Sequence, residues 1–457
     1  MLSTNAIFKL LKFKTEIKIF LLLFIVYAYF ITGFHSANEG SALALTKAIV
    51  DNQKLSIDEY KDLASVDISY YKDHYYSDKD PGRAFLGVPI YAIDKLFGFT
   101  SDSQVFFSME LVTAFFSAAS VVLLYRFVIF LKGSRVAALI LALVYGLATI
   151  LFSFSKTFFA HPHSAFFSLL GLFALVTSMR MREDNKKHLA KKYLVYSGIS
   201  FALSVLMEYT NLFVVAIFFI YYFYKSRFKN ILFLIIPFLV LTSIIPLYNY
   251  SIFGNFFETT YNHHYSYGNI ESIYFRADFL KEGLYGLLFS TWRGLFYYSP
   301  ILLFSLLGFF YWFKDRNDRT LPAALLLSFI AILVFYSATP AWRGGNSYGP
   351  RYLVSVMPFI VLPMWKIVEK YGKNKVFQII FIVLFIYSTI LVSAGSFAGP
   401  CPAESFTNPF LQQNLPQLIS DSLDSYLYQQ NKSTLYIMIF VELFLLWQLL
   451  KDFKYKI

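Results

Sequence analysis

The sequence predicts an all-α integral membrane protein with about twelve transmembrane helices. Hydrophobic side chains make up 57% of the 457 residues and charged side chains only 15%, so polar groups could not cover the surface of a water-soluble fold. The 40 Lys and Arg residues lie mainly in the gaps between apolar runs, as they do where charge orients membrane helices. The net charge of +12 therefore indicates membrane orientation and not a nucleic-acid surface.

The apolar segments are long enough to cross a hydrocarbon core, which takes on the order of twenty residues each. The first follows a lysine-rich start, and no small-residue cleavage site comes after it. We therefore interpret it as an uncleaved span and not as a signal peptide. The predicted spans are 18–34, 104–131, 136–155, 161–179, 193–208, 210–224, 230–250, 298–313, 320–338, 352–368, 375–395 and 434–450.

Charge placement tests these spans independently. If the N-terminus is cytoplasmic, every cytoplasmic connection is short and basic, as the positive-inside rule requires. These connections are 132–135, 180–192, 225–229, 314–319, 366–375 and the tail 451–456. The connections on the other side are 35–103, 155–160, 209, 251–297, 339–351 and 396–433, and they include the long loops. Shifting or dropping one span would invert all later connections, so the sequence predicts an even number of spans with both termini cytoplasmic.

The first external connection is more than a linker. Residues 41–52 alternate apolar and polar at helical spacing, and 85–97 is apolar but too short to span. Both predict interfacial helices that lie along the membrane surface. The sequence shows no repeat, low-complexity tract or soluble domain, and its one cysteine, Cys401, leaves no intrachain disulfide possible.

Under this topology, uncommon polar residues gather on the outer face. Charged groups at the lipid boundary are costly unless they face a polar cavity or one another. A shared polar cavity on this face is therefore the economical interpretation. The residues are Asn38, Glu39, Asp67, Asp78, Lys79, Asp80, Arg83, His161, His163, Glu208, Tyr209, His263, His264, Trp292, Arg293, Trp342, Arg343, Tyr348 and Arg351.

These residue types suit transfer onto an acceptor from an anionic donor. A carboxylate can deprotonate a hydroxyl or amine nucleophile, and a partly dry pocket can raise its pKa into a useful range. Lys and Arg can bind a phosphate and stabilise the charge that it gains as a leaving group. Aromatic side chains with polar tips, such as Trp292, Trp342 and Tyr348, suit both sugar faces and headgroup depth.

Each feature also has a plainer interpretation. Glu39 fits a polar residue at a helix end, and the SDKDPGR block around Lys79 fits a turn, because Asp, Pro and Gly favour turns. His161 and His163 are better explained as structural or hydrogen-bonding residues than as metal ligands. His263 and His264 are adjacent, which is poor geometry for two metal ligands on a helix. No spacing dictates a metal site, so no metal ligand or cofactor is assigned, and a requirement for a divalent cation stays open.

Six motifs, in their order along the chain, resemble the multi-spanning glycosyltransferases of the C superfold. They are NEGSALALTKAIV, VDISYYKDHYYSDKDPGRAFLGVPIY, AHPHSAFF, MEYTNLF, STWRGLFYYSPILL and WRGGNSYGPRYLVSVMPF. Within that group the chain is most similar to the branch that contains protein O-mannosyltransferases and the aminoarabinose transferase of lipid A. The resemblance covers roughly residues 15–370. It implies a GT-C-like catalytic module at 1–370, followed at 371–457 by C-terminal transmembrane helices with an external loop.

The resemblance also implies a reaction. The donor would be a polyprenyl-phosphate-linked sugar bound from the bilayer, and a lipid, glycan or protein acceptor would receive the sugar on the non-cytoplasmic face. Glu39 matches the family's base after the first span, although relatives often have an acidic pair where this chain has Asn38-Glu39. Lys79 matches the lysine associated with the donor phosphate. His161 stands where relatives carry a second carboxylate, so Asp67 is offered as the substitute.

The predicted site therefore has two classes of residue. The catalytic candidates are Glu39 and Asp67. The substrate-binding candidates are Asp78, Lys79, Arg83, His161, Glu208, Tyr209, Arg293, Trp342, Arg343, Tyr348 and Arg351. The alternative function is a transporter or flippase of a lipid-linked or anionic substrate, which would be expected to show paired repeats and ionisable residues at mid-membrane depth. A catalytically silent assembly factor is a third interpretation.

Overall fold

The computed structural model describes residues 14–34, 36–265, 275–315 and 319–454, and these are mainly helical. The first part comprises α2 (Lys14–Tyr29), α3 (Ala37–Asn52), α4 (Lys61–Ala64), β1 (Ile68–Tyr71), β2 (His74–Ser77), α5 (Gly82–Leu96), α6 (Asp102–Phe130), α7 (Arg135–Leu147), α8 (Leu151–Phe154), α9 (Ala160–Glu183), α10 (Lys187–Met207), α11 (Asn211–Ser226), α12 (Leu232–Thr242) and α13 (Ile244–Phe253).

The second part comprises α14 (Leu280–Leu288), α15 (Leu295–Tyr298), α16 (Leu303–Lys314), α17 (Thr320–Ser337), α18 (Met357–Val361), α19 (Met364–Tyr371), α20 (Lys375–Phe397), α21 (Leu415–Ile419), α22 (Tyr426–Gln430) and α23 (Thr434–Lys454). Short 3₁₀ helices lie between these elements: η1 (Asp58–Tyr60), η2 (Thr260–His263), η3 (Ala277–Phe279), η4 (Pro300–Leu302) and η5 (Arg351–Val356). A short π-helix, η6 (Phe410–Asn414), precedes α21.

All twelve predicted spans overlap helices, but fewer helices qualify as spans by length and composition. Among the described residues six do so, or seven if the pair 351–361 and 364–371, bent by 45°, counts as one. Shorter apolar helices at 135–147, 211–226 and 300–314 account for part of the difference. Proline explains part of the difference, because it has no backbone N–H to donate within a helix. Pro300 and Pro363 each lie where a predicted span is divided into separate helical segments. Multiple apolar spans are thus confirmed, while the number twelve stays a prediction.

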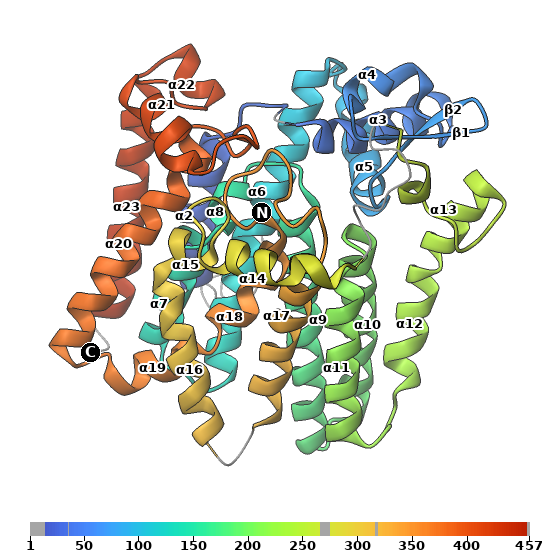
Figure 1. The fold of residues 1–457 in the computed structure, drawn as a ribbon. Helices are drawn as coiled ribbons and strands as arrows, with labels where there is room; N and C mark the ends of the chain where they lie inside the picture. Colours follow the sequence, from blue (N-terminus) through green and yellow to red (C-terminus); the bar gives the residue numbers. More distant parts are fainter. Residues whose placement is uncertain (1–13, 35, 266–274, 316–318, 455–457) are drawn as a thin grey trace, which may run out of the picture.

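The described parts of the short basic connections lie together at one end of the helices (Figure 1). The beginning of α2 meets the end of α23 through a 2.8 Å ion pair between Lys18 and Asp452. Further links at this end include Glu16 with Arg126, Arg180 with the Phe130 carbonyl, Ser134 with Glu369, Lys366 with Asp315 and Arg182 with the Ser226 carbonyl.

The long connections meet at the opposite end, where Figure 1 shows α3, α4, α5 and the hairpin on one side and α21 and α22 on the other. Tyr265 donates its backbone N–H to the Ile68 carbonyl at 2.9 Å. Residues of 339–351 and 396–433 also meet, because Glu404 donates its backbone N–H to Asn346 at 3.0 Å. The predicted gathering of the outer connections on one face is therefore present in the fold.

The first outer connection contains both predicted helices and a hairpin that the sequence analysis missed. Residues 41–52 lie in α3 and 85–97 overlap α5. Between them β1 and β2 pair antiparallel, with Tyr71 opposite His74. Lys72 and Asp73 form the two-residue turn at φ of 47° and 65°, which are the positive values that a tight hairpin turn requires.

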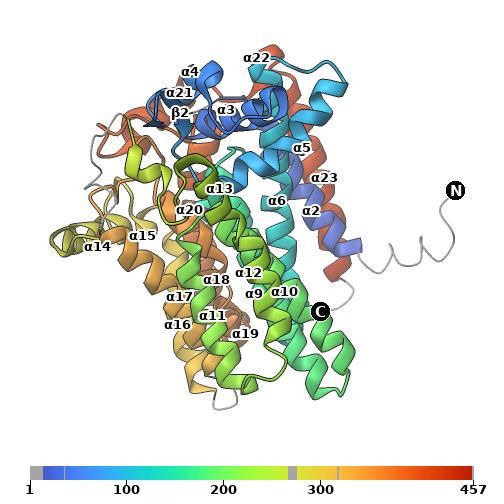
Figure 2. The same cartoon turned by 90° about the vertical axis from the view of Figure 1, so that its right-hand side faces the viewer.

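The core lies between closely packed helices. In Figure 2, α9 and α10 run side by side, and α2 lies beside α6 and α23. Gly171 of α9 faces the ring of Phe201 on α10, where a Cβ atom would lie only 2.5 Å from the ring. The absence of a side chain at Gly171 thus allows the close helix approach that is common in membrane bundles.

The predicted sidedness leads to a labelling experiment. In a Cys401→Ser background, Lys54→Cys should react with a membrane-impermeant maleimide from outside the cell, and Asp184→Cys should react only after permeabilisation. Both positions are exposed, and the basic connections are expected on the cytoplasmic side. Labelling of position 54 only from the cytoplasmic side would contradict the topology.

Candidate functional site

Glu39 lies in the first turn of α3, where the helix dipole favours a negative charge. Its side chain is completely buried, and Oε1 accepts a hydrogen bond of 2.6 Å from the backbone N–H of Phe158. Phe158 belongs to the short outer connection between α8 and α9. The candidate base is therefore held at the junction of the first and second outer connections.

Arg83 approaches the same junction from the first turn of α5. Its Nη1 donates to the Phe158 carbonyl at 2.8 Å, and the side chain is buried. Gly82 allows this position, because a Cβ atom there would lie 2.1 Å from the Leu206 carbonyl oxygen. Glu39 and Arg83 thus bind the N–H and the carbonyl of one residue, which fixes α3 and α5 against the 155–160 connection.

Lys79 is the centre of a compact group of charges. Its Nζ lies 2.6 Å from Asp78 and 3.0 Å from Asp67, and Nε2 of His264 lies 3.2 Å from Asp78. Burial alone would lower the pKa of Lys79, but the carboxylates of Asp78 and Asp67 outweigh it and raise that pKa. Burial would likewise raise the pKa of Asp78, yet Lys79 and His264 hold it below its ordinary value. The group therefore carries a firmly charged ammonium.

The same group contains donors that suit a divalent cation. One ligand atom each from Asp67, Asp78 and His264 lies within 4.8 Å of the others, and carboxylate with imidazole is a usual ligand set. The Lys79 ammonium binds both carboxylates, so a cation would have to compete with it. The sequence analysis did not find this group because its three members are far apart along the chain.

Asp80 is a carboxylate that the sequence analysis noted but did not assign to the site. Oδ2 accepts the backbone N–H of Tyr209 at 2.9 Å, and the Tyr261 hydroxyl lies 3.3 Å from Oδ1. Burial raises the pKa of Asp80 to about 7, and the nearby charge of Glu208 adds to this effect against the hydrogen bond from Tyr209. Asp80 therefore changes its charge near neutral pH.

Glu208 joins three spans at the outer face. Its carboxylate accepts hydrogen bonds from Ser164 at 3.0 Å, Tyr336 at 2.8 Å and Thr210 at 3.1 Å, and it lies 3.0 Å from Nδ1 of His161. His161 thus acts here as the partner of a carboxylate.

Arg351 extends the site towards the loop that precedes α18. Its guanidinium lies 5.3 Å from the ring centre of Phe159 and 5.1 Å from that of Tyr352. Tyr352 stacks on Tyr336 at 3.9 Å, which links Arg351 to the surroundings of Glu208.

The other four predicted binding residues have different surroundings. Arg293 donates to the carbonyls of Arg343, Gly345 and Trp292 at 2.6, 2.8 and 3.3 Å. Arg343 forms an exposed ion pair with Glu282 at 2.8 Å. Trp342 packs beside Trp292 and Gly286, and the Tyr348 hydroxyl donates to the Leu391 carbonyl at 2.8 Å. These contacts shape the loop 339–351 and do not join the four residues to the Lys79 group.

Two buried charges near Glu39 were missed by the sequence analysis. The Lys156 side chain is fully buried, and its Nζ lies 2.6 Å from the Asp424 carboxylate. Glu110 of α6 is also buried, and its carboxylate accepts the backbone N–H of Gly33 at 2.9 Å. A signal was available, since each is an ionisable residue inside an apolar run and such residues are usually functional in membrane proteins.

The comparisons with known proteins agree with the early resemblance. Residues 87–275 match the family model of dolichyl-phosphate-mannose-protein mannosyltransferases. The apo oligosaccharyltransferase of Archaeoglobus fulgidus superposes with a TM-score of 0.58 at 14% identity, over 86% of this chain and 57% of that one. No curated protein sequence matches.

Two further structures of that archaeal enzyme have the same fold. One is tethered to an acceptor peptide with the NVT sequon, with a TM-score of 0.56 at 16% identity over 84% of this chain and 55% of that one. The other, AglB with an inhibitory peptide and a dolichol-phosphate, has a TM-score of 0.54 at 14% identity over 85% and 57%. The chain thus spans little more than half the length of these enzymes. The predicted resemblance to multi-spanning glycosyltransferases of the C superfold is confirmed at the level of fold.

Proposed function

We propose that this chain is a membrane glycosyltransferase that moves a sugar from a polyprenyl-phosphate-linked donor to an acceptor on the extracytoplasmic face. The observation that carries the proposal is the group of Lys79, Asp67, Asp78 and His264 at the end of the helices where the long connections meet. Fixed cationic and acidic groups at one face suit transfer from a phosphate leaving group. The family match at 87–275 and the dolichol-phosphate bound to the archaeal relative support the same donor class.

The donor phosphate would be bound by Lys79 and Arg351. Lys79 lies between two carboxylates, and Arg351 packs its guanidinium against the rings of Phe159 and Tyr352. A phosphate that enters the group would compete with those carboxylates for the ammonium. We retain Arg351 in this role ahead of Arg293 and Arg343, because the Arg293 donors bind backbone carbonyls and Arg343 is paired with Glu282.

The reaction would use Glu39 as base. The acceptor oxygen or nitrogen attacks the anomeric carbon, the bond from that carbon to the phosphate oxygen breaks, and its electron pair stays on the phosphate. The acceptor proton would pass to the Glu39 carboxylate, whose Oε1 is held in place by the hydrogen bond from the Phe158 N–H. Asp67, which forms an ion pair with Lys79 at 3.0 Å, is the substitute base.

A transfer assay tests the proposal directly. Purified protein in nanodiscs should release polyprenyl phosphate from a polyprenyl-phosphate mannose donor when an extract of cell-envelope acceptors is present. Chelation by EDTA in the same assay shows whether a divalent cation at Asp67, Asp78 and His264 is needed. Movement of intact donor across a sealed vesicle membrane, with no cleavage of the sugar–phosphate bond, would favour the transporter or flippase instead.

A further inference from the structure

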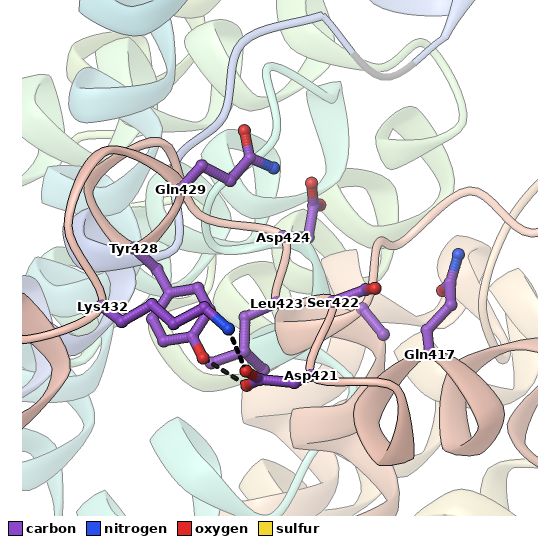
Figure 3. Close-up of a pocket in the computed structure, with 9 residues that line it drawn as sticks. Gln417, Asp421, Ser422, Leu423, Asp424, Tyr428, Gln429 and Lys432 are labelled. Atoms are coloured by element: carbon purple, nitrogen blue, oxygen red, sulfur yellow. Dashed lines mark hydrogen bonds and ion pairs between the residues drawn. The ribbon is translucent and has the colours of Figure 1, made fainter.

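The outer segment between α20 and α23 contains a polar pocket that lies outside the motifs of the family resemblance. It has a volume of about 460 Å³ and lies between the end of α20, α21 and α22 (Figure 3). This volume falls within the range of about 300 to 1,000 Å³ that small-molecule sites occupy. The pocket is therefore large enough for a ligand of a few rings.

The lining of the pocket suits hydroxyl groups. Gln417, Ser422, Asp424 and Gln429 present amide, hydroxyl and carboxylate groups, which together both donate and accept hydrogen bonds. Tyr428 adds an aromatic ring. A sugar has hydroxyls that donate and accept at every position and apolar ring faces, so it matches this mixture better than a hydrocarbon chain does.

The charges at the pocket are balanced. Lys432 and the Tyr428 hydroxyl both bind the Asp421 carboxylate at the rim, and Lys156 binds Asp424 on the inner side. With each carboxylate paired to an ammonium, the lining offers no surplus positive charge for a phosphate.

The pocket is joined to the candidate base through a short stretch of chain. Lys156, which binds the carboxylate and the carbonyl of Asp424 at 2.6 and 3.1 Å, precedes Phe158 by two positions. The N–H of Phe158 binds Glu39. One wall of the pocket is therefore attached to the same 155–160 connection that holds Glu39.

We propose that this pocket binds a neutral saccharide, as the part of a glycan acceptor that positions it for transfer. The role of the pocket in transfer rests on the proposed function. Saccharide binding itself does not depend on catalysis. The sequence leaves open a lipid, glycan or protein acceptor, and this proposal commits to a glycan. Binding of a peptide instead is one of the outcomes of the test.

The test is saturation-transfer NMR on the full chain in nanodiscs, with a panel of neutral di- and trisaccharides. At least one should bind, and Gln429→Ala combined with Ser422→Ala should weaken it about tenfold or more, as expected for two lost hydrogen bonds. Gln430→Ala combined with Ser405→Ala is the matched control, because these exposed residues of the same outer connection do not line the pocket, and it should bind as the wild type does.

Three results would overturn the assignment: no binding by any saccharide of the panel, equal binding by both double variants, or displacement of the saccharide by a peptide with an NVT sequon. The variants are at exposed positions, and an unchanged melting temperature confirms folding. A chain that binds saccharide but transfers no sugar would contradict the proposed enzymatic function and leave the pocket assignment intact.

Discussion

A Glu39→Gln protein is expected to keep its affinity for the donor and to lose turnover by about a hundredfold to ten-thousandfold. A base acts mainly in the transition state, so its removal lowers kcat without weakening donor binding. The amide oxygen of Gln can still accept the Phe158 N–H that Glu39 binds at 2.6 Å. The substitution therefore preserves the junction of α3 with the 155–160 connection and removes only the ability to take a proton.

The measurements are single-turnover rate and donor binding by equilibrium fluorescence, with Glu282→Gln as an exposed carboxylate control. Turnover within about threefold of wild type would remove Glu39 from the role, because that loss is far below a general-base contribution. Asp67→Asn would then be measured next. Normal turnover in both variants would exclude both carboxylates as the base and leave the enzymatic transfer itself in place.

The second large effect concerns Lys79. Lys79→Ala should weaken donor binding about tenfold to a hundredfold, which is the contribution of a charge-assisted hydrogen bond to a phosphate in a buried site. Lys54→Ala, at an exposed position of the same outer connection, should leave donor affinity unchanged. Lys79→Arg keeps the charge between Asp67 and Asp78 and should recover part of the binding.

The Lys79 variant needs a second measurement, because it also leaves two carboxylates without their ammonium partner, and breaking a buried pair is destabilising. A melting curve separates this effect, and Asp67→Asn combined with Lys79→Ala removes part of the repulsion. Equal donor affinity in Lys79→Ala and Lys54→Ala would remove Lys79 from phosphate binding, whatever the melting temperatures are.

The apolar helices, and the gathering of the long connections at one end of them, were predictable because lipid imposes a simple rule on sequence. Apolar length marks helices, and basic residues mark one end of them. The number of spans was harder, since Pro300 and Pro363 interrupt runs that look continuous by hydropathy alone. The hairpin was missed because its turn residues, Lys72 and Asp73, lack the Gly or Asn that usually marks a turn with positive φ.

The site was predictable in its residue types more than in its pairings. Lys79 and Glu39 stand out as charges beside apolar segments, but nothing near Asp78 in the sequence indicates that His264 lies 3.2 Å away. Arg293 and Arg343 carry the positive charge that suits phosphate binding. The sequence does not indicate, however, that the Arg293 guanidinium binds backbone carbonyls. Lys156 was passed over because a single lysine in a short connection looks like a boundary residue until its partner, Asp424, is known.

The ion pair between Lys18 and Asp452 has a consequence for the biogenesis of the protein. Its partners are 434 residues apart, and at ribosomal speeds the interval between their synthesis is roughly 20 to 90 seconds. During that interval α2 is inserted without its neighbour α23, and Lys18 lacks its final counter-charge. Truncation before α23 is therefore expected to leave Lys18 without its counter-charge and to make α2 more accessible to quality-control proteases.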